Sequence, residues 1–253
     1  MKIGVCGGFE RLAEAKAIGF DYVELPTSKI AGFTDEEFAE NLAVAKKAGI
    51  PTPAFNVLFP GDIDLMGKTP DAEIEAYLNK ALSRVQQLGG KVVVFGSGRS
   101  RMRPENMPYD QAFRRLVEVT RLIGKVAEKY GITIVIEPLN RSETNMINSV
   151  AEGACLRAMV NHPSVKLLAD YFHVAKDGEP ISDISRVCGV CHVHIATKEG
   201  RKYPVQMENG FGELFETLKA MKYEGMVSVE GGTDDFAGDA PAALALLKKL
   251  AEA

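Results

Sequence analysis

The chain has 253 residues, of which 46% are hydrophobic and 25% charged, and its formal net charge is -4. This composition is that of a globular protein and predicts one barrel-sized domain over residues 1–253. The acidic balance argues against a general nucleic-acid surface, and no apolar run approaches the roughly 20 residues of a membrane span. We therefore expect a cytoplasmic protein with a small-molecule partner and with no nucleic-acid or membrane partner.

Short apolar runs alternate with amphipathic segments along the whole chain. The apolar runs predict strands at residues 3–6, 22–25, 51–58, 91–95, 132–136, 165–169, 190–195 and 226–229. Apolar residues at helical spacing predict helices at residues 9–18, 35–48, 71–88, 108–130, 150–160, 181–187, 212–221 and 241–251. Thr34 and Glu37 have the spacing of a capping box, which marks the start of the second helix.

Eight strands in strict alternation with eight helices predict parallel strands joined by helical crossovers. At this length a closed (β/α)8 barrel is favoured over an open doubly wound sheet. In such a barrel the side chains at the C-terminal ends of the strands converge on one mouth. Chemistry is therefore expected from the residues that end or follow each strand.

Polar side chains stand at the ends of four adjacent predicted strands. They are Glu137, Asp170, His194 and Glu230. Two Glu, one Asp and one His form an oxygen-rich set that suits Mn²⁺, Co²⁺ or Mg²⁺ better than a thiolate-type zinc site. A group of buried salt bridges is the alternative, but the nearby cations, such as Arg141, Lys198 and Arg201, lie in predicted loops. His192 shares a strand face with His194 and is interpreted as a supporting or core residue.

These strand ends carry four motifs that match a known family. They are Glu137-Pro-Leu-Asn-Arg-Ser-Glu143, Ala169-Asp-Tyr-Phe-His173, His192-Val-His194 and Ser228-Val-Glu230. The set resembles the xylose-isomerase-like superfamily of sugar isomerases and epimerases, with the D-tagatose/D-psicose (allulose) 3-epimerases as the most similar pattern. The resemblance spans the whole predicted barrel.

The resemblance implies roles for individual residues. Glu137, Asp170, His194 and Glu230 would ligate a divalent ion, expected to be Mn²⁺ with Co²⁺ or Mg²⁺ as alternatives, and Glu137 and Glu230 would also be the acid/base pair. Glu143 and His173 would bind substrate oxygens. In the family an arginine follows the ligating histidine by six residues; here Gly200 takes that place and Arg201 is the expected equivalent.

The chemistry of these residues agrees with such a role. A divalent ion bound by a carbonyl oxygen and a neighbouring hydroxyl oxygen stabilises the enediolate that forms when a carbon-bound proton leaves. Two carboxylates on opposite faces can remove and return that proton, which epimerises the carbon, whereas one base with transfer between adjacent carbons isomerises. We therefore expect a metal-dependent epimerase or isomerase of a ketose, either free or phosphorylated. The enzyme could form a homo-oligomer.

Other functions stay open at this point. A lyase or dehydratase could use the same site to eliminate a β-substituent from a keto-sugar derivative. A DNA-repair endonuclease of the same superfamily relies on a histidine-rich zinc cluster, and this chain has 4 histidines in all. A non-catalytic binding barrel does not account for both carboxylates. The chain has no tryptophan for the walls of a ketohexose pocket, so the individual sugar is not assigned.

A second candidate site follows the fourth predicted strand. Arg99, Arg101 and Arg103 stand beside a Gly-Ser-Gly turn. Exposed backbone N–H groups with arginines nearby could bind a phosphate or carboxylate of the substrate. A solvated loop is the alternative interpretation.

Overall fold

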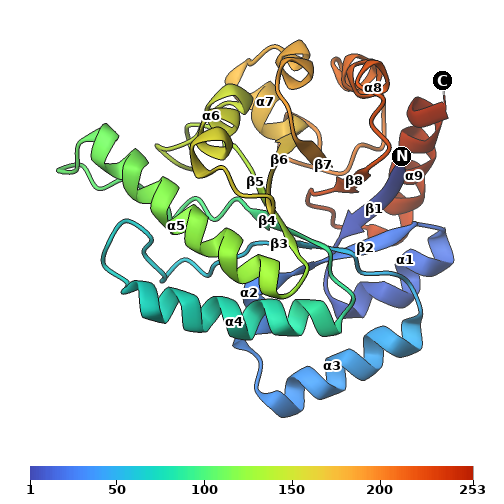
Figure 1. The fold of residues 1–253 in the computed structure, drawn as a ribbon. Helices are drawn as coiled ribbons and strands as arrows, with labels where there is room; N and C mark the ends of the chain where they lie inside the picture. The colour runs from blue at the N-terminus through green and yellow to red at the C-terminus, as the bar shows by residue number, and fades with distance from the viewer. Residues whose placement is uncertain (253) are drawn as a thin grey trace.

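The computed structural model describes residues 1–252, and its eight parallel strands close into a barrel (Figure 1). The strands are β1 (Lys2–Cys6), β2 (Tyr22–Pro26), β3 (Ala54–Asn56), β4 (Val92–Phe95), β5 (Thr133–Ile136), β6 (Val165–Asp170), β7 (Val190–Ile195) and β8 (Met226–Val229). Each strand pairs with the next in chain order, and β1 pairs with β8 to complete the ring. The predicted barrel is confirmed.

Helices surround the strands (Figure 1). The α-helices are α1 (Leu12–Ile18), α2 (Thr27–Gly32), α3 (Asp35–Ala48), α4 (Asp71–Gln87), α5 (Tyr109–Lys129), α6 (Val150–Val160), α7 (Tyr171–Asp177), α8 (Phe211–Ala220) and α9 (Phe236–Glu252), and the 3-10 helices are η1 (Phe9–Arg11) and η2 (Ile181–Arg186). The predicted capping box at the start of α3 is present, because Glu37 N donates to Thr34 Oγ1 and Thr34 N donates to Glu37 Oε2.

The prediction of eight helices was wrong, since residues 1–252 contain nine α-helices. The two short helices α2 and α7 were not predicted, because six or seven residues are too few to display a helical period. The segment predicted as a helix at 181–187 is the 3-10 helix η2. Helix α9 begins five residues ahead of the predicted start, and Pro241 lies inside it instead of at its first position.

The predicted strand at residues 51–58 is shortened to the three residues of β3. Pro51 and Pro53 lack the N–H groups that a strand ladder requires. On the other side, Val57 has a φ of 47°, which ends the extended backbone directly after Asn56. The third strand therefore presents Asn56 at its C-terminal end.

The interior of the barrel changes from apolar to polar toward the C-terminal ends of the strands. Val94, Val135 and Leu168 belong to a small buried cluster that is separate from the main core. Because side chains alternate along a strand, the residues two positions further on point to the same side. Glu137 follows Val135 by two residues and Asp170 follows Leu168 by two, so the alternation directs both carboxylates into the mouth.

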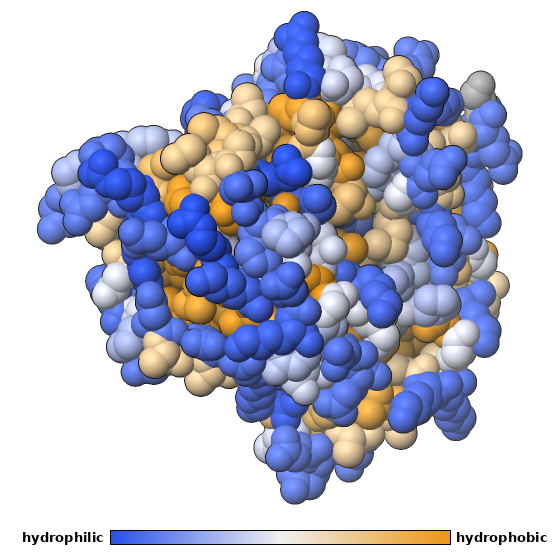
Figure 2. Space-filling model, viewed as in Figure 1, coloured by the Kyte–Doolittle hydropathy of each residue, from blue (hydrophilic) through white to orange (hydrophobic). Residues whose placement is uncertain are grey.

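The face of the molecule viewed in Figure 2 is largely hydrophilic, and its most hydrophobic residues, in orange, show mainly in gaps between the polar ones. No helix within residues 1–252 combines the length and the apolar character needed to cross a membrane.

Candidate functional site

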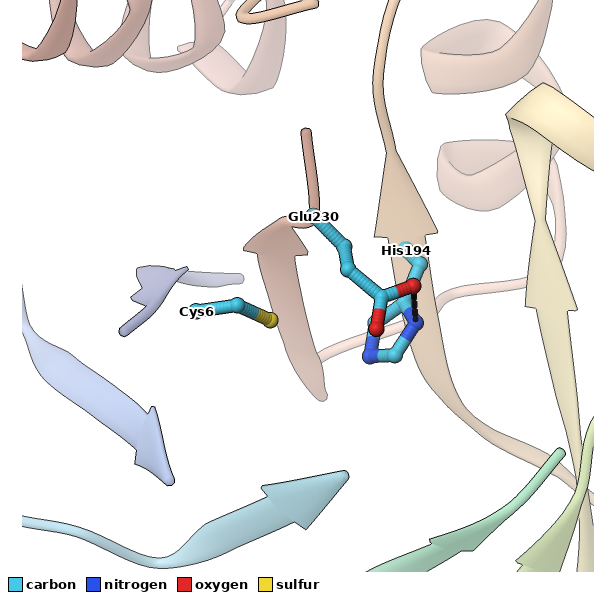
Figure 3. Close-up of side chains that lie close together, drawn as sticks. All are labelled: Cys6, His194 and Glu230. Atoms are coloured by element: carbon cyan, nitrogen blue, oxygen red, sulfur yellow. Dashed lines mark ion pairs between the residues drawn. The ribbon is translucent and has the colours of Figure 1, made fainter. Parts of the chain in front are cut away.

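The four strand-end groups converge at the mouth of the barrel. One ligand atom each from Glu137, Asp170, His194 and Glu230 lies within 4.8 Å of the others. His194 Nδ1 lies 3.0 Å from Glu230 Oε2 and 3.4 Å from Glu137 Oε1. Figure 3 shows Glu230 and His194 pointing toward each other from the neighbouring strands β8 and β7. The group is buried except for Glu230, which is partly exposed.

The contacts within this group fit a divalent ion. Glu137 Oε1 and His194 Nδ1 are buried and, although they lie close to each other, neither makes a hydrogen bond of good geometry with residues 1–252. Buried polar atoms without partners are unfavourable, and a cation between them would compensate for the lost hydration. Three carboxylates and one imidazole are also the donor types that Mn²⁺ and related ions accept. The residues present therefore fit the predicted ion.

A buried carboxylate that the sequence analysis did not single out lies behind the imidazole. His194 Nε2 is 3.0 Å from Glu24 Oε1, and His192 Nε2 is 2.8 Å from Glu24 Oε2. Ser228 donates a third hydrogen bond to Glu24, and the Ser228 hydroxyl lies 2.7 Å from that of Tyr22. Because a carboxylate only accepts, Nε2 of His194 carries the hydrogen and its Nδ1 faces the other ligands. The interpretation of His192 as a supporting residue agrees with this arrangement.

The charged groups of the site shift one another's pKa values. Burial raises the pKa of Glu137 and the pKa of Asp170 above the ordinary carboxyl value. At Glu230 burial acts in the same direction, but the charge and hydrogen bond of His194 together with the charge of Arg201 outweigh it and lower the pKa to about 2. Burial would lower the pKa of His194, yet Glu230 and Glu24 raise it well above the ordinary value. The raised pKa favours a proton on His194. An ion bound at Nδ1 would replace that proton, so ion binding would release a proton.

Arg201 extends from the loop after β7 over the carboxylates. Its Nη2 lies 2.6 Å from Glu230 Oε2 and 3.1 Å from Asp170 Oδ2, and its Nη1 lies 3.7 Å from Glu143 Oε1. Its φ is 48°, and its carbonyl accepts a hydrogen bond of 2.7 Å from Gly232 N, which joins this loop to the one after β8. The one-residue offset from the family spacing therefore does not keep Arg201 away from the site. One arginine leaves part of the negative charge of three carboxylates unbalanced.

His173 and Glu143 lie at the same mouth and are linked by Asn140. The backbone N–H of Asn140 donates to His173 Nδ1 at 3.1 Å, which leaves the imidazole hydrogen on Nε2. That Nε2 is 3.4 Å from Asp170 Oδ2 and 3.8 Å from Glu137 Oε1, and within the described chain it has no hydrogen-bond partner. Asn140 Nδ2 also donates to Glu143 Oε1 at 2.8 Å. Burial lowers the pKa of His173, so its neutral form is favoured.

The three arginines after β4 have different surroundings. Arg101 is fully buried, and its guanidinium donates to the main-chain carbonyls of Phe95 and Glu137. Burial lowers its pKa to about 10, so it stays charged at neutral pH. Arg103 donates to a main-chain carbonyl of its own loop. These contacts correct the expectation for Arg101, because a guanidinium buried against carbonyls does not face an anion from solvent. The predicted anion site rests with Arg99 and Arg103.

Three residues of the site were missed by sequence reasoning, and two of them lie at strand ends. Asn56 Nδ2 donates to Glu230 Oε1 at 3.2 Å. Cys6 forms a second close group with His194 and Glu230 (Figure 3). Burial raises the pKa of the Cys6 thiol well above its ordinary value, which makes it a poorer ligand than the carboxylates. Cys6 and Asn56 end their strands and follow the rule that identified the other four, whereas Glu24, the third missed residue, lies in the middle of β2.

Comparison with known proteins gives the family. The model of the xylose isomerase-like TIM barrel family matches residues 12–250. A D-psicose 3-epimerase of Ruminiclostridium cellulolyticum (strain ATCC 35319 / DSM 5812 / JCM 6584 / H10) is 29% identical over 230 residues, which cover 85% of this chain and 77% of that protein. A 3-dehydro-D-guloside 4-epimerase of Escherichia coli (strain K12) is 26% identical over 232 residues, which cover 88% of this chain and 86% of that protein.

The fold is shared with solved structures of this kind. A D-psicose 3-epimerase with D-tagatose from Clostridium cellulolyticum H10 superposes with a TM-score of 0.87 at 23% sequence identity, and the match covers 100% of both chains. The relatives confirm the prediction of an enzyme of the sugar isomerase and epimerase class. The family match over residues 12–250 then assigns the chain: it belongs to the xylose isomerase-like TIM barrel family.

Proposed function

We propose that the protein is a metal-dependent ketose epimerase that inverts a carbon atom next to a carbonyl group. The observation that carries the proposal is the position of Glu137 and Glu230, whose carboxylates approach His194 Nδ1 from two different strands at 3.4 and 3.0 Å. The relatives support it, because both are named as epimerases of keto sugars. No contact in the site favours the alternative of a lyase.

Glu137, Asp170, His194 and Glu230 would hold the ion, with Mn²⁺ as our first choice. When bound, the ion supplies a Lewis acid for the negative charge that develops on the substrate's oxygens. Glu24 keeps the Nδ1 lone pair of His194 directed toward it through the hydrogen bond at Nε2.

The two glutamates would move the proton. Glu137 follows β5 and Glu230 follows β8, so they reach the mouth from separate parts of the barrel wall. One carboxylate removes the proton from carbon, which leaves a planar enediolate, and the other returns a proton to the opposite face. Their pKa values are shifted in opposite directions, upward for Glu137 and downward for Glu230, so the two carboxylates differ in proton affinity.

Three further side chains would bind substrate oxygens. His173 offers an unpartnered Nε2–H, Glu143 offers a half-exposed carboxylate, and Arg201 offers a guanidinium already at the mouth. A phosphate on the substrate would be bound by Arg99 or Arg103, if the substrate carries one. Which ketose the site accepts depends on these contacts and on the shape of the surrounding loops.

Metal removal gives the direct experiment on this proposal. The protein is stripped with a chelator, and its conversion of a panel of ketoses that includes D-psicose is followed by chromatography with and without added Mn²⁺. The proposal expects epimerisation only after the ion is restored. Activity that is unchanged in the stripped protein would contradict metal dependence.

A further inference from the structure

The loop that follows β4 lies directly against Glu137. A Cβ atom added to Gly96 would collide with Glu137 Oε2, so the carboxylate occupies space that only a glycine leaves free. A Cβ added to Gly98 would lie 3.0 Å from both the carbonyl oxygen of Glu143 and the side chain of Leu139. The two glycines of this loop therefore allow its backbone to approach two of the proposed active-site residues.

The main chain of Glu137 is bonded to β4 and its loop at both polar groups. Glu137 N donates to the Phe95 carbonyl at 3.2 Å. The Glu137 carbonyl accepts a hydrogen bond of 2.6 Å from Arg101 Nη2, while Arg101 Nη1 donates to the Phe95 carbonyl at 3.1 Å. The pairing of β4 with β5 ends at Phe95 and Ile136, and from there Arg101 supplies the donor for the Glu137 carbonyl.

Arg101 is unusual for a charged residue. Its exposed fraction is 0%, and it forms no ion pair within 4.0 Å with any carboxylate of residues 1–252. Its charge is met by the two carbonyls and by the ring of Phe95, whose centre lies 5.7 Å from Cζ, while the carboxylates of Glu137 and Glu143 act on it only from beyond contact distance. A buried guanidinium without a carboxylate in direct contact is unfavourable, and an apolar side chain would fill the same space at lower cost. Packing alone therefore does not explain an arginine here.

We propose that Arg101 is a positioning residue for Glu137, which it holds by joining the end of β4 to the end of β5 beneath the carboxylate. The proposal rests on the proposed function of Glu137 as a metal ligand and as one of the two bases. Arg101 touches neither substrate nor ion and acts through the backbone of Glu137. Gly96 completes the arrangement by leaving room for the carboxylate.

The test compares Arg101→Met with a matched variant at another buried arginine. Arg84 is 5% exposed and donates to the main-chain carbonyls of Ile30 and Phe33 at 2.9 and 2.7 Å, but none of these residues belongs to the site. Arg84→Met therefore controls for the loss of a buried arginine as such. Mn²⁺ is titrated calorimetrically into metal-stripped wild type and both variants, and kcat, KM and Tm are measured after reconstitution.

Arg101→Met is expected to weaken Mn²⁺ binding about 10–100-fold, the usual effect of removing a support of a ligand, and to lower kcat more than it raises KM. Arg84→Met is expected to lower Tm and to leave Mn²⁺ affinity within about twofold, a margin far below the 10–100-fold effect. Gly96→Ala, which keeps Arg101 but displaces the carboxylate, is expected to weaken Mn²⁺ binding as well. If Arg101→Met does not fold, the Mn²⁺ affinity of Gly96→Ala is the measurement that tests the proposal.

Equal loss of Mn²⁺ affinity in Arg84→Met and Arg101→Met would overturn the proposal, as would wild-type affinity and kcat in Arg101→Met. If Arg101→Met does not fold, wild-type Mn²⁺ affinity in Gly96→Ala would also overturn the proposal. If wild type itself neither binds Mn²⁺ nor epimerises a ketose, the proposed function fails and this role fails with it. If wild type does both, the comparison of variants judges the role of Arg101 alone.

Discussion

The carboxylate of Glu24 lies 3.0 Å from Nε2 of His194, on the side of the imidazole away from the proposed metal ligands. Burial would raise the pKa of Glu24, but His194 and His192 hold it well below the ordinary carboxyl value, so Glu24 is charged. A charged acceptor fixes the hydrogen on Nε2 and leaves Nδ1 to face Glu137 and Glu230. The orientation of His194, a proposed metal ligand, is thus set by a residue outside the proposed ligand set.

Glu24→Gln is expected to weaken Mn²⁺ binding about 10–100-fold, because the amide has no charge and does not enforce the same tautomer of His194. Calorimetric titration of the stripped protein measures the change. Ser228→Ala removes one neighbour of Glu24 and keeps both histidine contacts, so its effect is expected to be smaller. Full Mn²⁺ affinity in Glu24→Gln would show that His194 needs no such support.

Asp170→Asn is expected to lower metal occupancy, because an anionic ligand is replaced by a neutral one. Asp170 Oδ1 also accepts a hydrogen bond of 2.8 Å from Phe172 N at the start of α7, and asparagine can keep that bond. The fold should therefore be retained, as circular dichroism would show. Metal analysis after dialysis against buffer with Mn²⁺ gives the occupancy, and wild-type occupancy would remove Asp170 from the ligand set.

Glu137→Gln and Glu230→Gln separate the role of ligand from that of base. Each amide keeps an oxygen that reaches the ion, but neither accepts a proton from carbon at neutral pH. Turnover is expected to fall by roughly 10²–10⁴-fold with part of the metal retained. Each variant should still exchange the carbon-bound proton of one epimer with solvent, and the two variants should differ in which epimer that is.

Proton exchange in these two variants is followed by NMR, together with the metal content of each purified protein. Full epimerase activity in one of them would contradict the assignment of two bases. Loss of activity that merely parallels loss of metal would leave the glutamates as ligands without a role in proton transfer.

Replacing Arg99 by glutamine tests the anion site that the sequence predicts after β4. If Arg99 binds a phosphate, KM for a phosphorylated ketose is expected to rise about tenfold or more, while KM for the neutral ketose stays the same. Arg103→Gln is measured in the same way, because Arg103 is the other arginine of the predicted anion site. Equal changes in KM for both substrates would show that the loop binds no anion and would favour the interpretation of a solvated loop.

The sequence predicts the barrel and four converging groups because both depend on local patterns. Short apolar runs, helical spacing and the position of an acid after a strand can be read without knowing which residues meet. Strands β7 and β8 have the predicted limits, and the capping box at Thr34 is present. The parallel arrangement of the strands then brings Glu137, Asp170 and the others to one mouth.

What the sequence could not give depends on contacts between distant segments. The role of Glu24 requires knowing that two histidines of β7 lie against β2 across the barrel interior. Asn56 was hidden by the misplaced limits of β3. The loop with Arg101 has the polar composition of a surface loop, and its burial beneath Glu137 appears only when β4 and β5 are paired.

Inversion of one carbon next to a ketose carbonyl, the activity proposed for this chain, can be followed by proton NMR in deuterated water. Mn²⁺-loaded protein is incubated with a panel of free and phosphorylated ketoses. One ketose is expected to gain its epimer, and a single deuterium is expected to enter at the inverted carbon. An unsaturated or dicarbonyl product, or deuterium at a carbon that becomes an aldehyde, would contradict the proposed inversion in favour of elimination or isomerisation.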